Sequence, residues 1–255
     1  MVNYEFDGTY AGYLTGLFEC FERKEWEASP IVSHSGPREL FGEVRTVVSD
    51  PAKAKRVQAG LVKRLGAEKA ARFWQNFLSE EAAAWRVGYR VARQVFLSGS
   101  QVLENYGDKD VLFFSQTVKK VSRERHRIKA FVRFAKSADG LYVATVEPDF
   151  NVLPLVVSFF RSRYADQPWL IFDAKRDYGM HYDGNSVTEV VREPVNGTSD
   201  RRNGLALAWD ARNEQVERLW KQYFKSTNIE ARRNLRLHLR HLPKRYWKYL
   251  VEKQP

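Results

Sequence analysis

Four residues in the middle of the chain have side chains that could form a catalytic site. His126 lies among cations in the block Ser122–Phe134. Neighbouring positive charge lowers the pKa of an imidazole, so His126 is expected to be neutral and able to act as a base or to contact a phosphate. Glu147 and Asp149 flank a single proline, and two close carboxylates can form an acid–base pair or bind a metal. Together with Arg133 they form the predicted catalytic set.

Structural interpretations of the same residues stay open beside the catalytic one. His126 can be a structural histidine where a helix meets a strand. Asp149 and Asp183 can serve as turn or capping residues. Asp173 and Asp177 would add further carboxylates on neighbouring turns, although Asp173 can instead pair with the basic residues that follow it. The sequence therefore leaves open whether the protein is an enzyme.

The basic residues gather in two blocks, which favours a polyanionic partner. The chain has 42 Lys and Arg against 31 Asp and Glu, a formal net charge of +11. Residues 119–136 and 212–255 together carry +15, and the rest carries −4. Because a solubility surplus would be spread evenly, this distribution predicts a nucleic acid, DNA in the first place, as the partner. The predicted contacts are Arg127, Lys129, Arg232, Arg233, Arg236, Arg240, Lys244 and Arg245, with Tyr246 and Trp247 for base stacking.

The aromatic residues and the acidic N-terminus have alternative interpretations. Tyr246 and Trp247 can instead anchor the C-terminal tail on the body of the protein. Phe131 and Phe134 fall on opposite faces of a predicted strand, so one of them can face a base. The first 46 residues carry a net charge of −4 and can dock a basic protein partner.

Several classes of site and location are excluded or disfavoured. The sequence has no glycine-rich phosphate loop and no HExxH motif, and the spacing of His238 and His241 is weak support for a metal, so no metal or cofactor is predicted. Cys20 is the one cysteine, which excludes an internal disulfide and a cysteine-held zinc or iron–sulfur site. No secretory signal and no apolar stretch long enough to span a bilayer is found, so we expect a soluble, cytoplasmic protein.

Hydrophobic periodicity predicts an α+β fold, an antiparallel sheet built from hairpins and covered by N-terminal and C-terminal helices. Turn signals at Asp139-Gly140 and Asp183-Gly184 mark two hairpins. The whole chain, 1–255, is expected to form a single domain, with 52–124 as a possible helical subdomain. The predicted strands are 3–6, 43–48, 128–134, 141–146, 169–173, 178–182 and 186–191, and the predicted helices are 10–27, 52–105 with a break at Gly66, 110–124, 151–164, 213–225 and 228–242.

This arrangement supplies a reason for the catalytic set to assemble. If residues 128–134 pair with residues 141–146, the far ends of the two strands lie together. His126 and Glu147 flank those ends in the sequence. The hairpin is therefore the element expected to bring them into one site.

A set of short segments spread over nearly the whole chain forms a recognisable pattern. These segments are Tyr4–Thr15, Glu124–Arg127, Phe131–Phe134, Glu147-Pro148, Trp169–Asp173, Leu219–Phe224, Asn228-Ile229, Arg233-Asn234 and Pro243–Trp247. In these segments the chain resembles a bacterial family of DNA metabolism or DNA repair proteins linked to a radical SAM protein. The resemblance implies a role in DNA repair or modification beside a radical SAM partner, which would supply the cluster chemistry, and it implies no catalytic residues. Some relatives carry a uracil-DNA glycosylase-like domain, which is not expected after Pro255.

Overall fold

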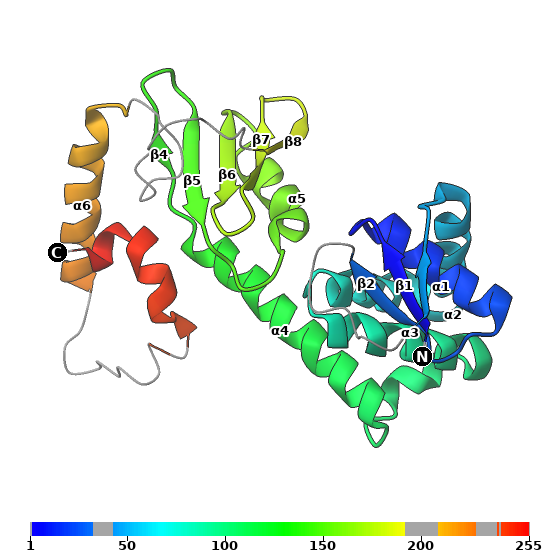
Figure 1. Cartoon of the computed structure of the whole chain (residues 1–255). Coiled ribbons are helices and arrows are strands. Elements are labelled where there is room, and N and C mark those ends of the chain that lie inside the picture. Colours follow the sequence, from blue (N-terminus) through cyan, green and yellow to red (C-terminus); the bar gives the residue numbers. More distant parts are fainter. Residues whose placement is uncertain (1, 33–42, 192–208, 228–238, 240, 255) are drawn as a thin grey trace. The chain divides into compact units, whose positions relative to one another are not determined.

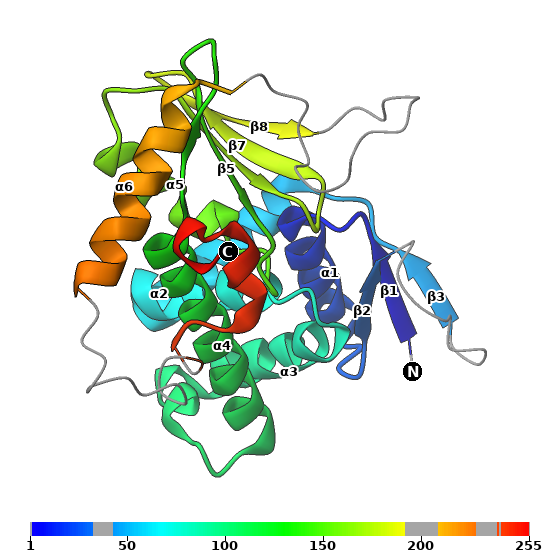
Figure 2. The same cartoon turned by 90° about the vertical axis from the view of Figure 1, so that its left-hand side faces the viewer.

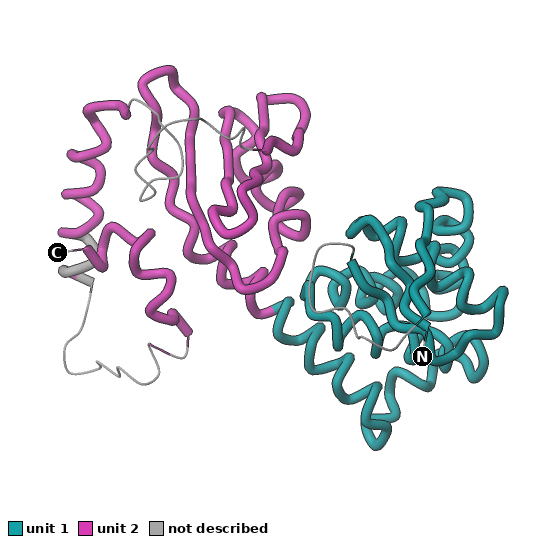
Figure 3. The backbone as a smooth tube through the Cα atoms, in the orientation of Figure 1, with its two compact units in different colours: residues 1–122 teal, residues 123–255 magenta. Residues whose placement is uncertain are grey.

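The computed structural model describes residues 2–32, 43–191, 209–227, 239 and 241–254. The described chain divides into two compact units, residues 1–122 and residues 123–255 (Figure 3). Each unit contains one sheet, so the α+β class is confirmed. The expectation that the chain is a single domain stays a prediction.

The first unit contains a small parallel sheet of strand order β2-β1-β3 (Figure 1). β1 (Val2–Phe6) pairs in parallel with both β2 (Ser29–Val32) and β3 (Glu43–Thr46). Parallel neighbours require a crossover between them, and α1 (Tyr10–Arg23) supplies the one from β1 to β2. The prediction of an antiparallel sheet is therefore wrong for this unit.

Helices make up the rest of the first unit. α2 (Pro51–Phe77) begins at the N-cap Asp50, whose carboxylate accepts from the backbone N–H of Ala52 and Lys53. Gly66 has φ of 77° inside α2, a conformation that favours glycine, which confirms the predicted break. α3 (Ala82–Ser98) and the 3-10 helix η1 (Ser100–Glu104) follow α2.

The core of this unit is aromatic and holds its hydroxyl groups in hydrogen bonds. The Tyr13 hydroxyl donates to the carbonyl of Trp85 at 2.9 Å, and the Tyr89 hydroxyl donates to the carbonyl of Tyr13 at 2.7 Å. A Cβ atom at Gly88 would lie 2.4 Å from the Tyr13 hydroxyl, so glycine is needed for this approach. Buried polar groups that are paired in this way stabilise one arrangement of the core.

α4 (Lys109–Phe131) runs from the first unit into the second and differs from expectation. The strand predicted over 128–134 is wrong, because α4 continues to Phe131 and the next strand, β4, contains only Ala135–Lys136. The inward positions Val121, Glu124 and Ile128 recur at helical spacing and are all buried. Burial along one helix face therefore prevailed over the local alternation of apolar and polar residues.

The second unit contains a mixed sheet of order β4-β5-β6-β7-β8 (Figure 1). β5 (Tyr142–Val146) pairs antiparallel with β4 but parallel with β6 (Trp169–Asp173), and α5 (Leu153–Arg163) connects the parallel pair. The all-antiparallel sheet is thus not what the structure contains. The hairpin of β7 (Tyr178–Tyr182) and β8 (Val187–Val191) agrees with the prediction.

The C-terminal elements lie on the β4 side of this sheet (Figure 1). α6 (Arg212–Thr227) begins beside the edge strand β4, where the Asn213 Oδ1 accepts from the backbone N–H of Lys136 at 3.0 Å. Of the two 3-10 helices that end the chain, η3 (Lys244–Tyr249) lies beside the C-terminal half of α4, and η4 (Val251–Lys253) lies beside α6 (Figure 2). The helix predicted over 228–242 lies largely outside the described residues.

Candidate nucleic-acid interface

The C-terminal half of α4 presents cations on its outer surface. We call Arg123, Arg125, Arg127 and Lys129 the α4 basic stripe; these residues span about 9 Å of helix at 1.5 Å per residue. Lys119 and Lys120, in the preceding turn of the same helix, are also exposed. Arg123 is exposed and Arg125 is half-buried, and neither forms an ion pair with any described residue. Arg123 and Arg125 can therefore meet an anion without first breaking an ion pair with a described residue, whereas Arg127 pairs with Glu124 at 3.3 Å.

Glu124, the one Asp or Glu residue between positions 119 and 136, directs its side chain into the interior of the unit. The Glu124 side chain is 1% exposed. Its Oε1 accepts from the backbone N–H of Asp149 at 2.9 Å and from the Tyr246 hydroxyl, and its Oε2 accepts from Arg245 Nη2 at 2.8 Å. Every Lys, Arg, Asp or Glu side chain on the outer surface of this helix segment is thus a cation, because the carboxylate is turned inward and paired with Arg245 there.

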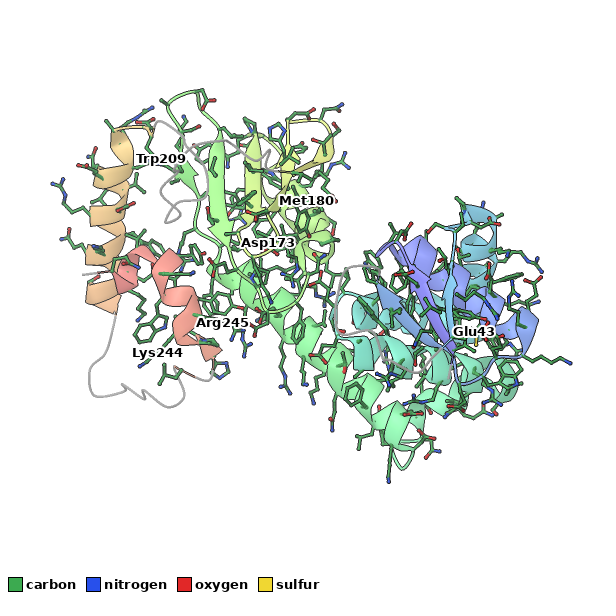
Figure 4. The ribbon with its side chains drawn as sticks, in the orientation of Figure 1. Glu43, Asp173, Met180, Trp209, Lys244 and Arg245 are labelled. Atoms are coloured by element: carbon green, nitrogen blue, oxygen red, sulfur yellow. The ribbon has the colours of Figure 1, made fainter. Side chains whose placement is uncertain are left out.

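Arg245, predicted to bind phosphate, is used inside the protein instead. Its Nη2 lies 2.8 Å from Glu124 Oε2 and 2.8 Å from Asp149 Oδ2. Figure 4 shows Arg245 between η3 and α4. Burial would lower the pKa of Arg245, but Tyr246 and the two carboxylates raise it above its usual value. An arginine held between two carboxylates is a weak phosphate ligand, whereas Lys244, next to it, is exposed.

The aromatic residues of the C-terminal block anchor it to the unit. Tyr246 is 4% exposed, which contradicts a base-stacking role for this ring. Burial and the hydrogen bond to Glu124 raise its pKa. Trp247 is half-buried, and its Nε1 donates to the carbonyl of Leu242 at 3.2 Å. Tyr246 therefore anchors the C-terminal segment to α4, as the alternative interpretation expects.

The two carboxylates of the predicted catalytic set lie close to the C-terminal segment. Glu147 Oε2 accepts from Lys248 Nζ at 2.5 Å. Burial would raise the pKa of Glu147, but hydrogen bonds from Lys248 and Tyr249 lower it. Asp149 pairs in turn with Arg245, so both carboxylates lie next to cations. Such an environment suits structural ion pairs better than a proton-donating acid.

His126 and Arg133 lie elsewhere on the unit. His126 is exposed on α4. The predicted hairpin around Asp139-Gly140 is present, but its first strand is only Ala135–Lys136, so His126 lies in the helix and is not positioned by the hairpin. Arg133 Nη2 pairs with Glu252 Oε1 at 2.8 Å, and its guanidinium lies 5.3 Å from the centre of the Trp220 ring. Glu147 and Asp149 are thus neighbours through the C-terminal segment, while Arg133 belongs to another cluster. The catalytic set stays a prediction.

Asp173 forms a buried ion pair at the end of β6. Its Oδ2 accepts from Arg176 Nη1 at 2.8 Å, and Arg176 also donates to the carbonyls of Pro148 and Asp149 at 3.2 Å. Burial raises the pKa of Asp173, although Arg176 opposes the shift. This is the internal pairing that the sequence left open.

The structure describes only some of the residues that the sequence predicts to contact nucleic acid. Arg127 lies at the edge of the stripe, and its Nη1 donates to Glu124 Oε2 at 3.3 Å. Lys129 Nζ lies 4.8 Å from the centre of the Phe159 ring. Burial, with a contribution from Arg125, lowers the pKa of Lys129. Arg232, Arg233, Arg236 and Arg240 lie outside the described residues.

Sequence reasoning missed Glu124, Arg123 and Arg125. The inward helical spacing of Val121, Glu124 and Ile128 was a signal that could have separated the internal carboxylate from the outward arginines. The strand assigned to 128–134 obscured that spacing. The family resemblance did include Glu124, but without a role.

Two features are absent from the described residues. None of their helices is long and apolar enough to cross a membrane. No group of three or more His, Cys, Asp or Glu side chains among them is placed to hold a metal ion.

Comparisons with known proteins identify a family but not an activity. Neither curated proteins nor solved structures yield a match to the chain. A family described as a domain of unknown function, DUF4130, matches residues 82–252, about two thirds of the chain. The match begins at α3, covers the second part of the first unit, and includes the α4 basic stripe and the Glu124 cluster. The chain therefore belongs to the DUF4130 family.

Proposed function

We propose that the protein binds nucleic acid, DNA in the first place, through the α4 basic stripe, in a DNA repair or modification role. One observation carries the proposal: α4 directs its cations outward while its one acidic residue in this block is buried and neutralised. Exposed cations such as Arg123 bind phosphates by releasing counterions, and this electrostatic term supplies most of the sequence-independent binding to DNA.

Charge reversal on the stripe tests this proposal. We expect Arg123→Glu with Arg125→Glu, in the full chain, to weaken binding of a fluorescein-labelled 20-nucleotide DNA measured by fluorescence anisotropy. Two lost phosphate contacts should reduce the slope of log K against log salt by roughly 2. The matched control is Lys63→Glu with Arg64→Glu, two exposed cations on α2 that change the net charge by the same amount.

The comparison between the two double variants decides the outcome. A loss confined to the Arg123 and Arg125 variant supports the stripe. Equal losses in both variants would show that net charge alone attracts DNA and would overturn the assignment. A wild-type affinity that does not change with salt would overturn the proposal itself.

We further propose, from the family resemblance, that a radical SAM protein is the partner, and that acidic residues near the N-terminus dock it. The acidic segment is not a separable tail, because β1 is the central strand of its sheet and Tyr4 is fully buried. Deleting residues 1–46 would therefore unfold the unit, so the test uses the exposed Glu22 and Glu27.

Co-purification with that radical SAM protein tests the partner. We expect it to bind the wild-type chain, detected by its iron–sulfur absorbance, and to be lost from Glu22→Lys with Glu27→Lys. Retention by the variant would show that docking does not use these acids. No co-purification with the wild-type chain would contradict the partnership.

A further inference from the structure

Phe159 is an aromatic ring on the outer side of α5 that the interior does not cover. Its side chain is 37% exposed, whereas that of its neighbour Phe160 is 2% exposed. The two rings meet edge to face with centroids 5.2 Å apart, so Phe160 supports Phe159 from within. The ring is therefore both presented to solvent and held in place.

Cations surround this ring on two helices of the same unit. Lys129 Nζ, from the α4 basic stripe, lies 4.8 Å from the Phe159 ring centroid. Arg163 follows Phe159 by four residues and so lies on the same face of α5, and it is exposed. α5 contains no acidic residue. We call Arg125, Lys129, Phe159 and Arg163 the α4–α5 patch.

An aromatic ring among cations fits one kind of nucleic acid better than another. Duplex DNA presents phosphates but keeps the faces of its bases stacked inside. A single strand offers phosphates and also unstacked bases, whose flat faces pack on aromatic side chains in a sequence-tolerant way. Charge alone would favour both forms, whereas an exposed supported ring adds affinity only for the single strand.

We propose that the α4–α5 patch binds single-stranded nucleic acid, with Phe159 stacking on an unpaired base and Lys129 and Arg163 contacting the flanking phosphates. This inference rests on the proposed nucleic-acid binding and adds the strandedness of the partner. Phe159 thereby takes the base-stacking role that the sequence assigned to Tyr246, which is buried.

The test compares a single strand with a duplex. Phe159→Leu keeps an apolar side chain and removes the ring. We expect it to weaken binding of fluorescein-labelled (dT)12 to the full chain by roughly tenfold, as expected for one stacked base. Its affinity for a 12-base-pair duplex and its salt slope should stay within about twofold of wild type, because stacking releases no counterions.

Two further variants complete the test. Tyr106→Leu removes another exposed ring, 54% exposed and outside the patch, and should leave both affinities unchanged. Phe159→Trp keeps a stacking surface and should retain (dT)12 binding. Urea unfolding of each variant checks that it is folded.

The outcomes separate this inference from the function on which it rests. If the wild-type chain binds neither DNA, the proposed function fails. If it binds both and Phe159→Leu changes neither affinity, or weakens both equally, nucleic-acid binding stands and the single-strand inference is overturned. If Phe159→Leu does not fold, the Phe159→Trp variant tests the stacking contact instead. Loss of (dT)12 binding in a folded Phe159→Trp variant would contradict stacking.

Discussion

Glu124 is a buried carboxylate that joins three elements of the second unit. Its buried carboxylate accepts from Tyr246, from Arg245 and from the backbone of Asp149, so it connects α4, η3 and the loop after β5. A buried charge is tolerable only when its partners are in place, and removing one member of such a pair leaves the rest desolvated and unpaired.

We expect Glu124→Gln to lower the free energy of unfolding by about 2 kcal/mol, the magnitude of a lost hydrogen bond to a charged group. The amide can still accept from Tyr246 and Asp149, but it no longer neutralises Arg245. Urea unfolding at neutral pH measures the change. Glu68→Gln, on the exposed side of α2, is the matched control and should stay within about 0.5 kcal/mol of wild type. Equal unfolding midpoints for the two variants would contradict the role given to Glu124.

At the scale of elements, α4 and the C-terminal segment determine which charges reach the surface. The helical burial of Val121, Glu124 and Ile128 places the arginines between them outward. η3 then pairs Arg245 with Glu124 and Lys248 with Glu147, so these two cations of the last block are already engaged with carboxylates of the same unit.

Glu252 in η4 ties the C-terminal segment to α6. Its side chain is 4% exposed, its Oε1 pairs with Arg133 at 2.8 Å, and its Oε2 accepts from Trp220 Nε1 at 2.9 Å. Burial would raise the pKa of Glu252, but a backbone hydrogen bond, Arg133 and Trp220 lower it. A lowered pKa means that the folded state favours the ionised carboxylate.

This contact should therefore be sensitive to acid. A carboxylate with a lowered folded-state pKa contributes stability above its unfolded pKa, about 4.3 for Glu, and that contribution is lost as the pH falls through the lower folded value. We expect wild type to exceed Glu252→Gln by on the order of 1 kcal/mol at pH 7, and the difference to shrink below about pH 4.

Urea unfolding of both proteins from pH 7 down to about pH 3.5 measures this difference. The exposed Glu189→Gln on β8 is the control and should show little difference at any pH. A gap between wild type and Glu252→Gln that is constant over this range would contradict the ionised pair.

At the scale of the whole molecule, the surplus charge belongs to one unit. Residues 123–255 hold 25 Lys and Arg against 16 Asp and Glu, whereas residues 1–122 hold 17 against 15. A unit with this excess attracts polyanions over a distance set by the ionic strength. The charge-reversal variants proposed above therefore compare a cation pair in the charged unit with one in the nearly neutral unit.

The sequence alone determined the local features. Caps and turns depend on a few adjacent residues, so the break at Gly66, the hairpin after Tyr182 and α5 with its early Pro154 were predictable. So were the α+β class and the uneven charge. The strand over 128–134 was the local failure, since its alternation conflicted with a longer helical pattern.

Only the tertiary structure decided which strands run parallel and which cations stay at the surface. β5 and β6 read as ordinary strands, and only the path of α5 between them makes the pair parallel. Arg123 and Arg245 look alike in the sequence, but the fold brings Arg245 to a carboxylate 121 positions away and leaves Arg123 outside. Contacts between distant residues depend on the route of the chain, which local pattern does not contain.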